Sequence, residues 1–504
     1  MKKLIVLSLF TFSFSLFTFS QSNFIKDSLD TYIPREMKRW NIPGVAVAVV
    51  KDGKVVYMKG FGVREIGKPD KVDENTLFMI ASNTKAYTAT AVTLLAYQRR
   101  MSLDDKVSKF IPGYKLYDSL ASANVTVRDI LCHRIGFLTF QSDFLNWDCN
   151  MSRKDLMMNM RTVKPMYGFR TRFGYCNMGF VTAGEVIPAV TDTSWADFLK
   201  YHIFMPLNMS RTTTRNIDIV NDKNAAKPYT WYGGKLVPIP YDSVDNIAPC
   251  GGINSCVKDI ANWIIMQLDS GRFNGKQVFP FEVLKRTRAS NTIVTPYPEA
   301  PGTHFSTYGL GWFLTDYMGK RIVEHDGGAS GFVTKTALVP EEHFGVVVLT
   351  NTDANGFMDA LASQLIDDQL HQPYKNVSAE QYKGFSQYIA QFDSADNALW
   401  AAAAKKPKPA LELKAYTGTY INEVYGKIEI KEEKGKLVIH FSHHPHFTGV
   451  LEPLGENTFV CNYNPVLWGV KETPFKVQDG KVVAVTVSIN NEVDYLPYTF
   501  KKIE

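Results

Sequence analysis

The chain lacks the features that would place it across a membrane or on a nucleic acid. Beyond the first twenty of its 504 residues, no apolar run is long enough to cross a bilayer. No block of Lys and Arg occurs and the formal net charge is only +6, so a nucleic-acid partner is not indicated. Hydrophobic residues at 45% and charged residues at 21% are ordinary for a globular protein, which excludes disorder over the whole chain. The length suffices for two or three domains.

The chain also lacks a disulfide framework and any internal repeat. Its six cysteines stand at irregular spacings, and such a low density is not typical of a disulfide-stabilised fold. We therefore expect mostly buried thiols, and the sequence does not predict a pairing.

Residues 1–20 have the layout of a secretory signal peptide. Two lysines are followed by an uncharged apolar run over residues 4–19, with small residues before the cleavage site. The run is short for a membrane span, and no nearby Cys offers a lipid anchor. We predict cleavage between Ser20 and Gln21 and a secreted or periplasmic protein with no integral membrane span. An uncleaved N-terminal anchor is the alternative.

Strand patterns lie at both ends of the first 370 residues, with helical patterns between them. Near the start, two β-branched apolar runs flank an Asp-Gly turn, a hairpin signal. The expected strands are 45–50, 55–58, 309–313, 333–339 and 346–349, and the expected helices include 85–100 and 358–370. We expect an α/β (α+β) domain in which both ends of the segment contribute strands to one antiparallel sheet flanked by helices.

The composition changes near residue 372. Residues 378–404 have a helical pattern, and the following Lys-Lys-Pro-Lys-Pro segment breaks any helix. From residue 411 onward, short alternating strands with Gly turns predict a small antiparallel sandwich or barrel. The expected parts are a signal peptide at 1–20, a first domain at 21–372, a helical linker at 373–409 and an all-β domain at 410–504.

The strongest chemical signal is the segment Ser82-Asn83-Thr84-Lys85. It follows an apolar run and opens a helical pattern, and positions i and i+3 share one helix face. An amine beside a serine hydroxyl takes its proton when burial lowers the lysine pKa. The same pattern also occurs by chance, as a helix cap with a solvated lysine.

Two further segments carry residues suited to the same chemistry. Tyr175 and Asn177 lie in a Gly-flanked segment that can present a phenol to a site, although, taken alone, a core tyrosine is the better explanation of the first. The segment His325-Asp326-Gly327-Gly328 precedes a strand pattern, and its glycines permit close approach of backbone to a ligand. A turn beside a solvated histidine is the alternative.

Together, in this order, the three motifs resemble those of the penicillin-recognising serine hydrolases. Within them the chain is similar to the class C β-lactamase, esterase and D-aminopeptidase branch, peptidase family S12. The resemblance covers residues 33–370. The segment at 416–426 resembles the lipocalin-like barrel often appended to these hydrolases.

The resemblance implies a role for each matching residue. Ser82 is the expected acylated nucleophile. Lys85 and Tyr175 share the general acid and base work, and which of them takes the proton is open. Backbone N–H groups of Ser82 and Gly328 are expected to form the oxyanion hole. The expected catalytic residues are Ser82, Lys85 and Tyr175, and the expected substrate-binding residues are Asn177, His325, Gly327 and Gly328. No metal or cofactor is needed.

The chain departs from the family pattern in its third motif and in the segment around His133. His325 stands where many relatives have Lys, so a permanent charge for a substrate carboxylate is missing, and this favours a peptidase or esterase over an efficient β-lactamase. Asp326 either attracts a substrate amine or points away on an alternating strand. His133 is expected to be a structural hydrogen-bonding residue. Four histidines over residues 440–446 suggest a metal site, but a barrel strand and loop explains them better.

These observations predict hydrolysis of an amide or ester through a Ser82 acyl-enzyme. Peptides with D-residues, from cell-wall turnover, are the first substrate class, and a carboxylesterase or weak β-lactamase is the alternative. A non-hydrolytic penicillin- or peptide-binding protein, or an assembly protein that oligomerises through the C-terminal domain, is the alternative of another class.

Overall fold

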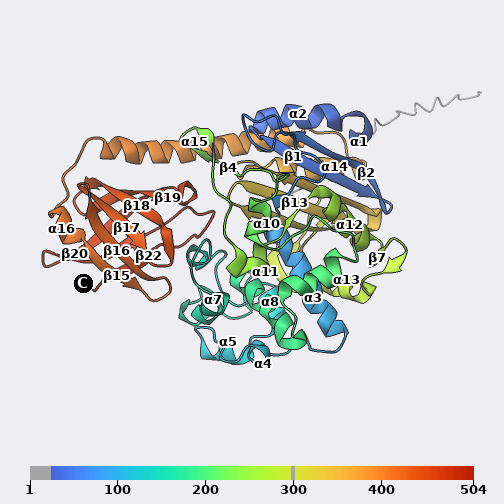
Figure 1. Cartoon of the computed structure of the whole chain (residues 1–504), viewed down its shortest axis with the longest axis horizontal. Helices are drawn as coiled ribbons and strands as arrows, with labels where there is room; N and C mark the ends of the chain where they lie inside the picture. Colours follow the sequence, from blue (N-terminus) through green and yellow to red (C-terminus); the bar gives the residue numbers. More distant parts are fainter. Residues whose placement is uncertain (1–23, 297–300, 504) are drawn as a thin grey trace, which may run out of the picture.

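The computed structural model describes residues 24–296 and 301–503, which form two domains joined by the long helix α15 (Val377–Ala403) (Figure 1). The predicted signal peptide lies outside the described residues. Within the described part of the chain, no helix is both long enough and apolar enough for a bilayer crossing.

An antiparallel sheet of eight strands forms the centre of the first domain. The order across it is β2-β1-β14-β13-β12-β11-β10-β9, so strands from both ends of the segment meet at the pairing of β1 with β14. The strands are β1 (Gly44–Lys51), β2 (Lys54–Gly62), β9 (Thr292–Thr295), β10 (Ser306–Tyr308), β11 (Phe313–Tyr317), β12 (Lys320–Ala329), β13 (Phe332–Val339) and β14 (Phe344–Thr350). This confirms the expected antiparallel sheet, to which both ends of the first domain's sequence contribute strands.

Helices cover both faces of this sheet. Strand β14 is buried along its whole length, because α12 (Val257–Leu268) packs on one face and α14 (Phe357–Gln369) on the other. This two-sided burial explains why its sequence reads as a continuous apolar run rather than an alternating one. The remaining longer helices are α2 (Leu29–Trp40), α3 (Thr84–Tyr97), α7 (Arg153–Asn159), α8 (Asn177–Thr191) and α13 (Phe281–Thr287).

Several short elements complete the first domain. The short helices are α1 (Phe24–Asp27), α4 (Val107–Phe110), α5 (Ser119–Asn124), α6 (Val127–Leu131), α9 (Trp195–Leu199), α10 (Asn216–Val220) and α11 (Ala248–Gly251). Three small two-stranded sheets pair β3 (Phe78–Met79) with β6 (Asn254–Ser255), β4 (Tyr229–Tyr232) with β5 (Lys235–Pro238), and β7 (Arg272–Phe273) with β8 (Lys276–Gln277).

One expected strand is wrong. Residues 309–312 form the connection between β10 and β11 instead of a strand. Gly311 has a left-handed φ of 75°, and a Cβ there would lie 2.5 Å from the carbonyl oxygen of Lys85. The glycines of this segment therefore serve a close approach to the backbone of α3, a use that sequence periodicity does not reveal.

The C-terminal domain is a closed barrel of eight antiparallel strands in sequence order, as the all-β expectation required. Its strands are β15 (Gly418–Asn422), β16 (Gly426–Glu433), β17 (Lys436–Phe441), β18 (His444–Gly455), β19 (Thr458–Asn464), β20 (Val470–Gln478), β21 (Lys481–Val487) and β22 (Tyr498–Lys502), preceded by α16 (Leu413–Tyr416). Buried aromatic side chains, including Tyr416, Phe459 and Phe475, pack against one another inside it. Figure 1 shows the barrel beside the first domain, with α15 running across both.

Candidate active site

Ser82 and Lys85 lie where the chain passes from the sheet region into helix α3. Ser82 belongs to a 3₁₀ turn (Ala81–Asn83), and α3 begins at Thr84 directly after it. Ala81 has a left-handed φ of 45°, a strained conformation for a residue with a Cβ and one that often accompanies functional turns. Ser82 is half-buried, and Lys85 Nζ lies 2.9 Å from its Oγ.

Lys85 is fully buried and surrounded by oxygen atoms. Its Nζ is 2.7 Å from Asn177 Oδ1 and 2.8 Å from the carbonyl oxygen of Cys250, besides the contact with Ser82. Burial lowers the pKa of Lys85 to about 8. The amide and carbonyl oxygens only accept hydrogen bonds, so a neutral Lys85 donates to both and directs its lone pair at the Ser82 hydroxyl. The geometry therefore suits a general base.

Tyr175 and Asn177 approach the same point from the start of α8. The Tyr175 phenol is within hydrogen-bonding reach of the Ser82 side chain, and Lys85 Nζ lies 4.7 Å from the centre of its ring. Burial raises the pKa of Tyr175 well above its usual value, so the phenol is neutral at ordinary pH. Asn177 is buried at the first position of α8 and contacts Lys85 directly.

The two glycines of the third motif lie beside the serine turn. β11 pairs with β12 as far as Glu324 and no further, so the segment from His325 onward extends past it. A Cβ on Gly327 would lie 2.1 Å from the carbonyl oxygen of Ile80, and glycine is thus what permits β12 to approach the turn. Gly328 is exposed, and a Cβ there would meet nothing within 4 Å.

His325 lies behind this group and does not hydrogen-bond to the serine, lysine or phenol. Its Nδ1 is 2.7 Å from the carbonyl oxygen of Asp326, which only accepts, so Nδ1 carries the hydrogen. Nε2, 3.0 Å from the Tyr308 hydroxyl, then accepts from it. Burial lowers the pKa of His325 to about 3. The histidine is therefore neutral and offers no charge to a substrate carboxylate.

Asp326 points to the opposite face of the sheet, as the alternating-strand alternative held. Its carboxylate lies 2.6 Å from Lys335 Nζ, and the same Lys335 also pairs with Glu324 and with Asp359 of α14. Since α14 covers that face, Asp326 is part of a structural ion-pair cluster and has no contact with the serine.

His133 supports the phenol from behind, in keeping with the structural role expected for it. It is buried, its Nδ1 accepts the backbone N–H of Cys176 at 3.0 Å, and its ring centre lies 4.3 Å from that of Tyr175. The histidine thus fixes the backbone beside the phenol.

Sequence reasoning missed one side chain at the heart of this arrangement. Asp143 lies fully buried in the loop before α7 and accepts the Asn177 amide N–H at 2.5 Å. Burial raises the pKa of Asp143 to about 7. A single Asp in an aromatic loop has no spacing or periodicity that marks it, so no sequence signal identifies this contact. Tyr308, the hydrogen-bond partner of His325, lies directly before the glycine-rich segment 309–312, for which the sequence pattern predicts a strand.

The histidines over residues 440–446 belong to the barrel, and three of them have separate partners. His440 contacts Glu433, His443 contacts Asn150 of the first domain, and His444 contacts both Tyr425 and the carbonyl oxygen of Trp147. All six cysteines are free thiols, five of them buried.

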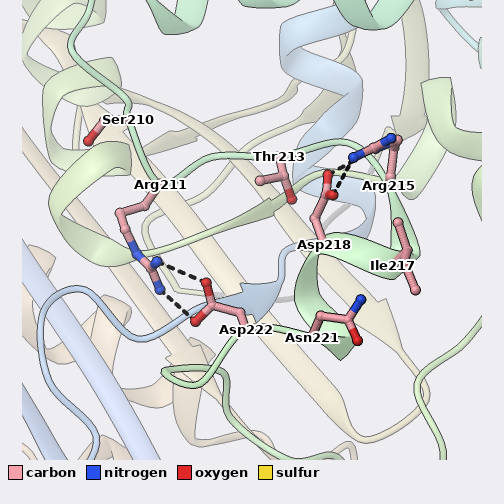
Figure 2. Close-up of a pocket in the computed structure, with 8 residues that line it drawn as sticks. All are labelled: Ser210, Arg211, Thr213, Arg215, Ile217, Asp218, Asn221 and Asp222. Carbon is pink, nitrogen blue, oxygen red and sulfur yellow. Dashed lines mark hydrogen bonds and ion pairs between the residues drawn. The ribbon is translucent and has the colours of Figure 1, made fainter.

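A surface pocket of about 530 Å³ lies away from these residues (Figure 2). Its two arginines are already paired, Arg211 with Asp222 and Arg215 with Asp218. The pocket contains none of the predicted catalytic residues. These four charges are paired with one another, so they offer no unpaired charge to a ligand.

The fold and the serine–lysine contact define a serine hydrolase built on the β-lactamase fold. Residues 29–371 match the family model described as Beta-lactamase, and the chain therefore belongs to the beta-lactamase family. Residues 402–502, which include the barrel, match a domain of unknown function, DUF3471.

Curated relatives and a solved structure agree with this assignment. The chain is 28% identical over 424 residues to the unguisins hydrolase ungD of Aspergillus violaceofuscus, covering 78% of this chain and 74% of the relative. It is 28% identical to protein flp of Staphylococcus aureus, covering 72% and 70%. The octameric penicillin-binding protein homologue of Pyrococcus abyssi has the same fold, with a TM-score of 0.62 at 22% identity over 94% of this chain and 99% of that one.

Proposed function

We propose that this protein is an exported hydrolase that cleaves an amide or ester through an acyl-enzyme on Ser82. The observation that carries the proposal is the surrounding of Lys85, which is fully buried among three oxygen atoms with the Ser82 hydroxyl as one of them. Burial supplies the lowered pKa that a lysine base requires, and the neutral Tyr175 phenol suits the acid.

The proposed reaction has two halves. Neutral Lys85 removes the proton of the Ser82 hydroxyl while Oγ attacks the substrate carbonyl carbon, and the resulting oxyanion is stabilised by the N–H groups of Ser82 and Gly328. The C–N or C–O bond then breaks as the proton passes through the Tyr175 phenol to the leaving group, which leaves an ester on Ser82. Water, deprotonated by the same groups, attacks this ester, releases the acid and returns the proton to Ser82.

The substrate class follows from the charge of the third motif. A neutral His325 cannot act as the cation that pairs with a substrate carboxylate, so substrates that need such a cation are disfavoured. Peptides with D-residues are the first class to test, and carboxylic esters are the second. The name of one relative, a hydrolase of unguisins, supports hydrolysis as the type of reaction.

Turnover and covalent labelling test the proposal together. Wild type is expected to hydrolyse members of a panel of D- and L-aminoacyl anilides, short p-nitrophenyl esters and nitrocefin, and mass spectrometry is expected to find the acyl group on Ser82. Ser82→Ala and Lys85→Met should abolish both signals. An acyl adduct that forms but is never released would instead indicate a binding protein, and turnover that survives in Ser82→Ala would refute the mechanism.

Export and assembly are tested separately. The mature N-terminus is expected at Gln21 in protein recovered from the periplasm or medium, and an intact Met1 in membrane fractions would contradict cleavage. The solved relative from Pyrococcus abyssi is octameric. We propose that this chain also self-associates through its barrel, and sedimentation of the purified protein checks it; a monomer at all concentrations would contradict it.

A further inference from the structure

The barrel and the first domain share a buried aromatic contact. Phe144, in the loop that follows the first domain's Gln141, is only 1% exposed. Its ring packs against five barrel rings, and the centres of three of them lie 4.5 Å (Tyr425), 4.9 Å (Trp468) and 5.9 Å (Tyr498) away. A side chain of the first domain thus occupies the barrel's aromatic cluster and ties this loop to the barrel.

The backbone of the same loop is held by two polar side chains of the barrel. Tyr498 accepts the Ser142 N–H at 2.9 Å and donates its own hydroxyl to Asp494 at 2.8 Å. Asp494 also accepts the Phe144 N–H at 3.2 Å. Ser142 has a left-handed φ of 71°, a conformation that costs energy in a residue with a Cβ and persists where its surroundings enforce it.

Asp143 lies between these two anchored residues and faces the opposite way, toward α8. Its Oδ2 accepts the Asn177 amide N–H at 2.5 Å, while Asn177 Oδ1 accepts from Lys85 at 2.7 Å. An asparagine side chain can occupy its site in two orientations. With Asp143 present, the amide nitrogen is held on the carboxylate and the oxygen faces Lys85. The reverse orientation would place one donor against another.

A second contact runs from the barrel toward the phenol. Tyr495, next to Asp494, stacks on Phe140 at 5.8 Å, and Phe140 packs edge-on against Tyr175 at 5.6 Å. The barrel segment at residues 494–498 therefore makes two sets of contacts with the active site. One set leads through the 142–144 loop to Asn177, and the other leads through Phe140 to Tyr175.

We propose that the C-terminal barrel is a positioning element of the active site, in which Asp494 and Tyr498 hold the 142–144 loop so that Asp143 orients the Asn177 amide against Lys85. This inference rests on the proposed function, because its measurable consequence is the rate of the Ser82 reaction. Asp494 and Tyr498 touch neither Ser82 nor Lys85 directly and act through the loop. The barrel is then required for full turnover.

The test compares full-length variants that differ in one hydroxyl. Tyr498→Phe removes the hydrogen bonds to Ser142 and Asp494 and keeps the ring in place. Tyr420→Phe is the matched control, since its buried hydroxyl donates within the barrel to the Tyr416 carbonyl oxygen and touches nothing in the first domain. With a p-nitrophenyl ester, Tyr498→Phe is expected to lower kcat by about tenfold with KM within about twofold, while the control keeps the wild-type kcat.

A double variant separates positioning from general damage. If Tyr498 acts through Asp143, combining Tyr498→Phe with Asp143→Ala lowers kcat no further than Asp143→Ala alone. Asp494→Asn, which keeps the volume and loses acceptor capacity, is the second single variant should Tyr498→Phe fail to fold. Faster hydrogen–deuterium exchange of residues 140–147 in either variant, relative to the control, would support the loop's dependence on the barrel.

Unchanged kcat in folded Tyr498→Phe and Asp494→Asn would overturn the inference and leave the proposed function intact. Losses that multiply in the double variant would also overturn it. Wild type with no Ser82-dependent turnover of any substrate would refute the proposed function itself, and this inference with it.

Discussion

The pH dependence of turnover tests the assignment of Lys85 as the base. With a pKa of about 8, about a tenth of Lys85 is neutral at pH 7 and about nine-tenths at pH 9. We therefore expect kcat/KM for a p-nitrophenyl ester to rise about tenfold between these pH values, with a midpoint near 8. Ser82→Ala supplies the background rate at each pH.

Apart from Asp143, the groups around Lys85 do not change charge in this window. The pKa of His325 is lowered by burial to about 3, and burial raises that of Tyr175 well above 10, so neither changes charge between pH 7 and 9. Burial likewise raises the pKa of the Cys250 thiol to about 11. Burial raises the pKa of Asp143 to about 7, so this carboxyl goes from about half ionised at pH 7 to almost fully ionised at pH 9, and a variant without it is needed beside the wild type.

Asp143 also provides the perturbation. Its negative charge favours protonated Lys85, so Asp143→Asn is expected to lower the Lys85 pKa and to move the midpoint to lower pH by roughly one unit. Asp218→Asn, at the distant pocket of Figure 2, is the control and should leave the midpoint unchanged. A kcat/KM that does not rise between pH 7 and 9, or a midpoint of this rise that moves to higher pH in Asp143→Asn, would refute the reasoning.

Three further changes test the structure away from the reacting groups. Gly311→Ala places a Cβ 2.5 Å from the Lys85 carbonyl oxygen, whereas a Cβ at Gly319, which has a similar positive φ, meets nothing within 4 Å. Both variants should lose about 1 kcal/mol of unfolding free energy in urea, and only Gly311→Ala should lose more and also show a reduced kcat. Equal behaviour of the two variants would contradict the close approach. Burial, and after it the charge of the neighbouring Asp242, raises the pKa of Asp148 to about 8. The stabilising contribution of protonated Asp148 is therefore lost as pH rises from about 4 to 8, and Asp148→Asn should raise Tm more at pH 8 than at pH 5. A difference in Tm that does not depend on pH would contradict this pKa. Lys335→Met leaves three carboxylates without their cation and should lower the free energy of unfolding by about 2 kcal/mol. This is less than the loss for a fully buried ion pair, because the three carboxylates are 25% to 48% exposed. The kcat should be unchanged, and a loss of kcat would place this cluster at the active site.

The parts of the site that sequence predicts are those set by short spacing. Ser82 and Lys85 are three positions apart, and the first turn of a helix brings such side chains together whatever the rest of the fold does. The sequence also predicts the sheet, because β1 and β14 are continuous apolar runs rich in β-branched residues. The approach of Tyr175 to Ser82 could be expected only from the resemblance to a known family, since a separation of 93 positions carries no geometric information of its own.

The parts that sequence does not predict depend on packing between distant segments. Asp143 contacts Asn177 from a loop whose backbone also hydrogen-bonds to the barrel, about 350 positions further along the chain. No periodicity encodes that docking. The strand predicted at 309–312 is wrong for a related reason, because Gly311 permits a close approach to the α3 backbone at Lys85 and does not mark a strand.

The charges in the site favour Lys85 over the Tyr175 phenol as the base. Tyr175 is buried, and its pKa is raised, because ionising it would place a negative charge in an apolar setting. Asp143 already occupies the anionic position near Lys85, and it does so through the Asn177 amide rather than by direct contact. Under the proposed mechanism the proton that leaves Ser82 therefore has one basic acceptor within bonding distance, which is neutral Lys85. The phenol then transfers this proton between the lysine side of the site and the leaving group without ever holding a full negative charge, and this division of work is what a pH limb near 8 would report.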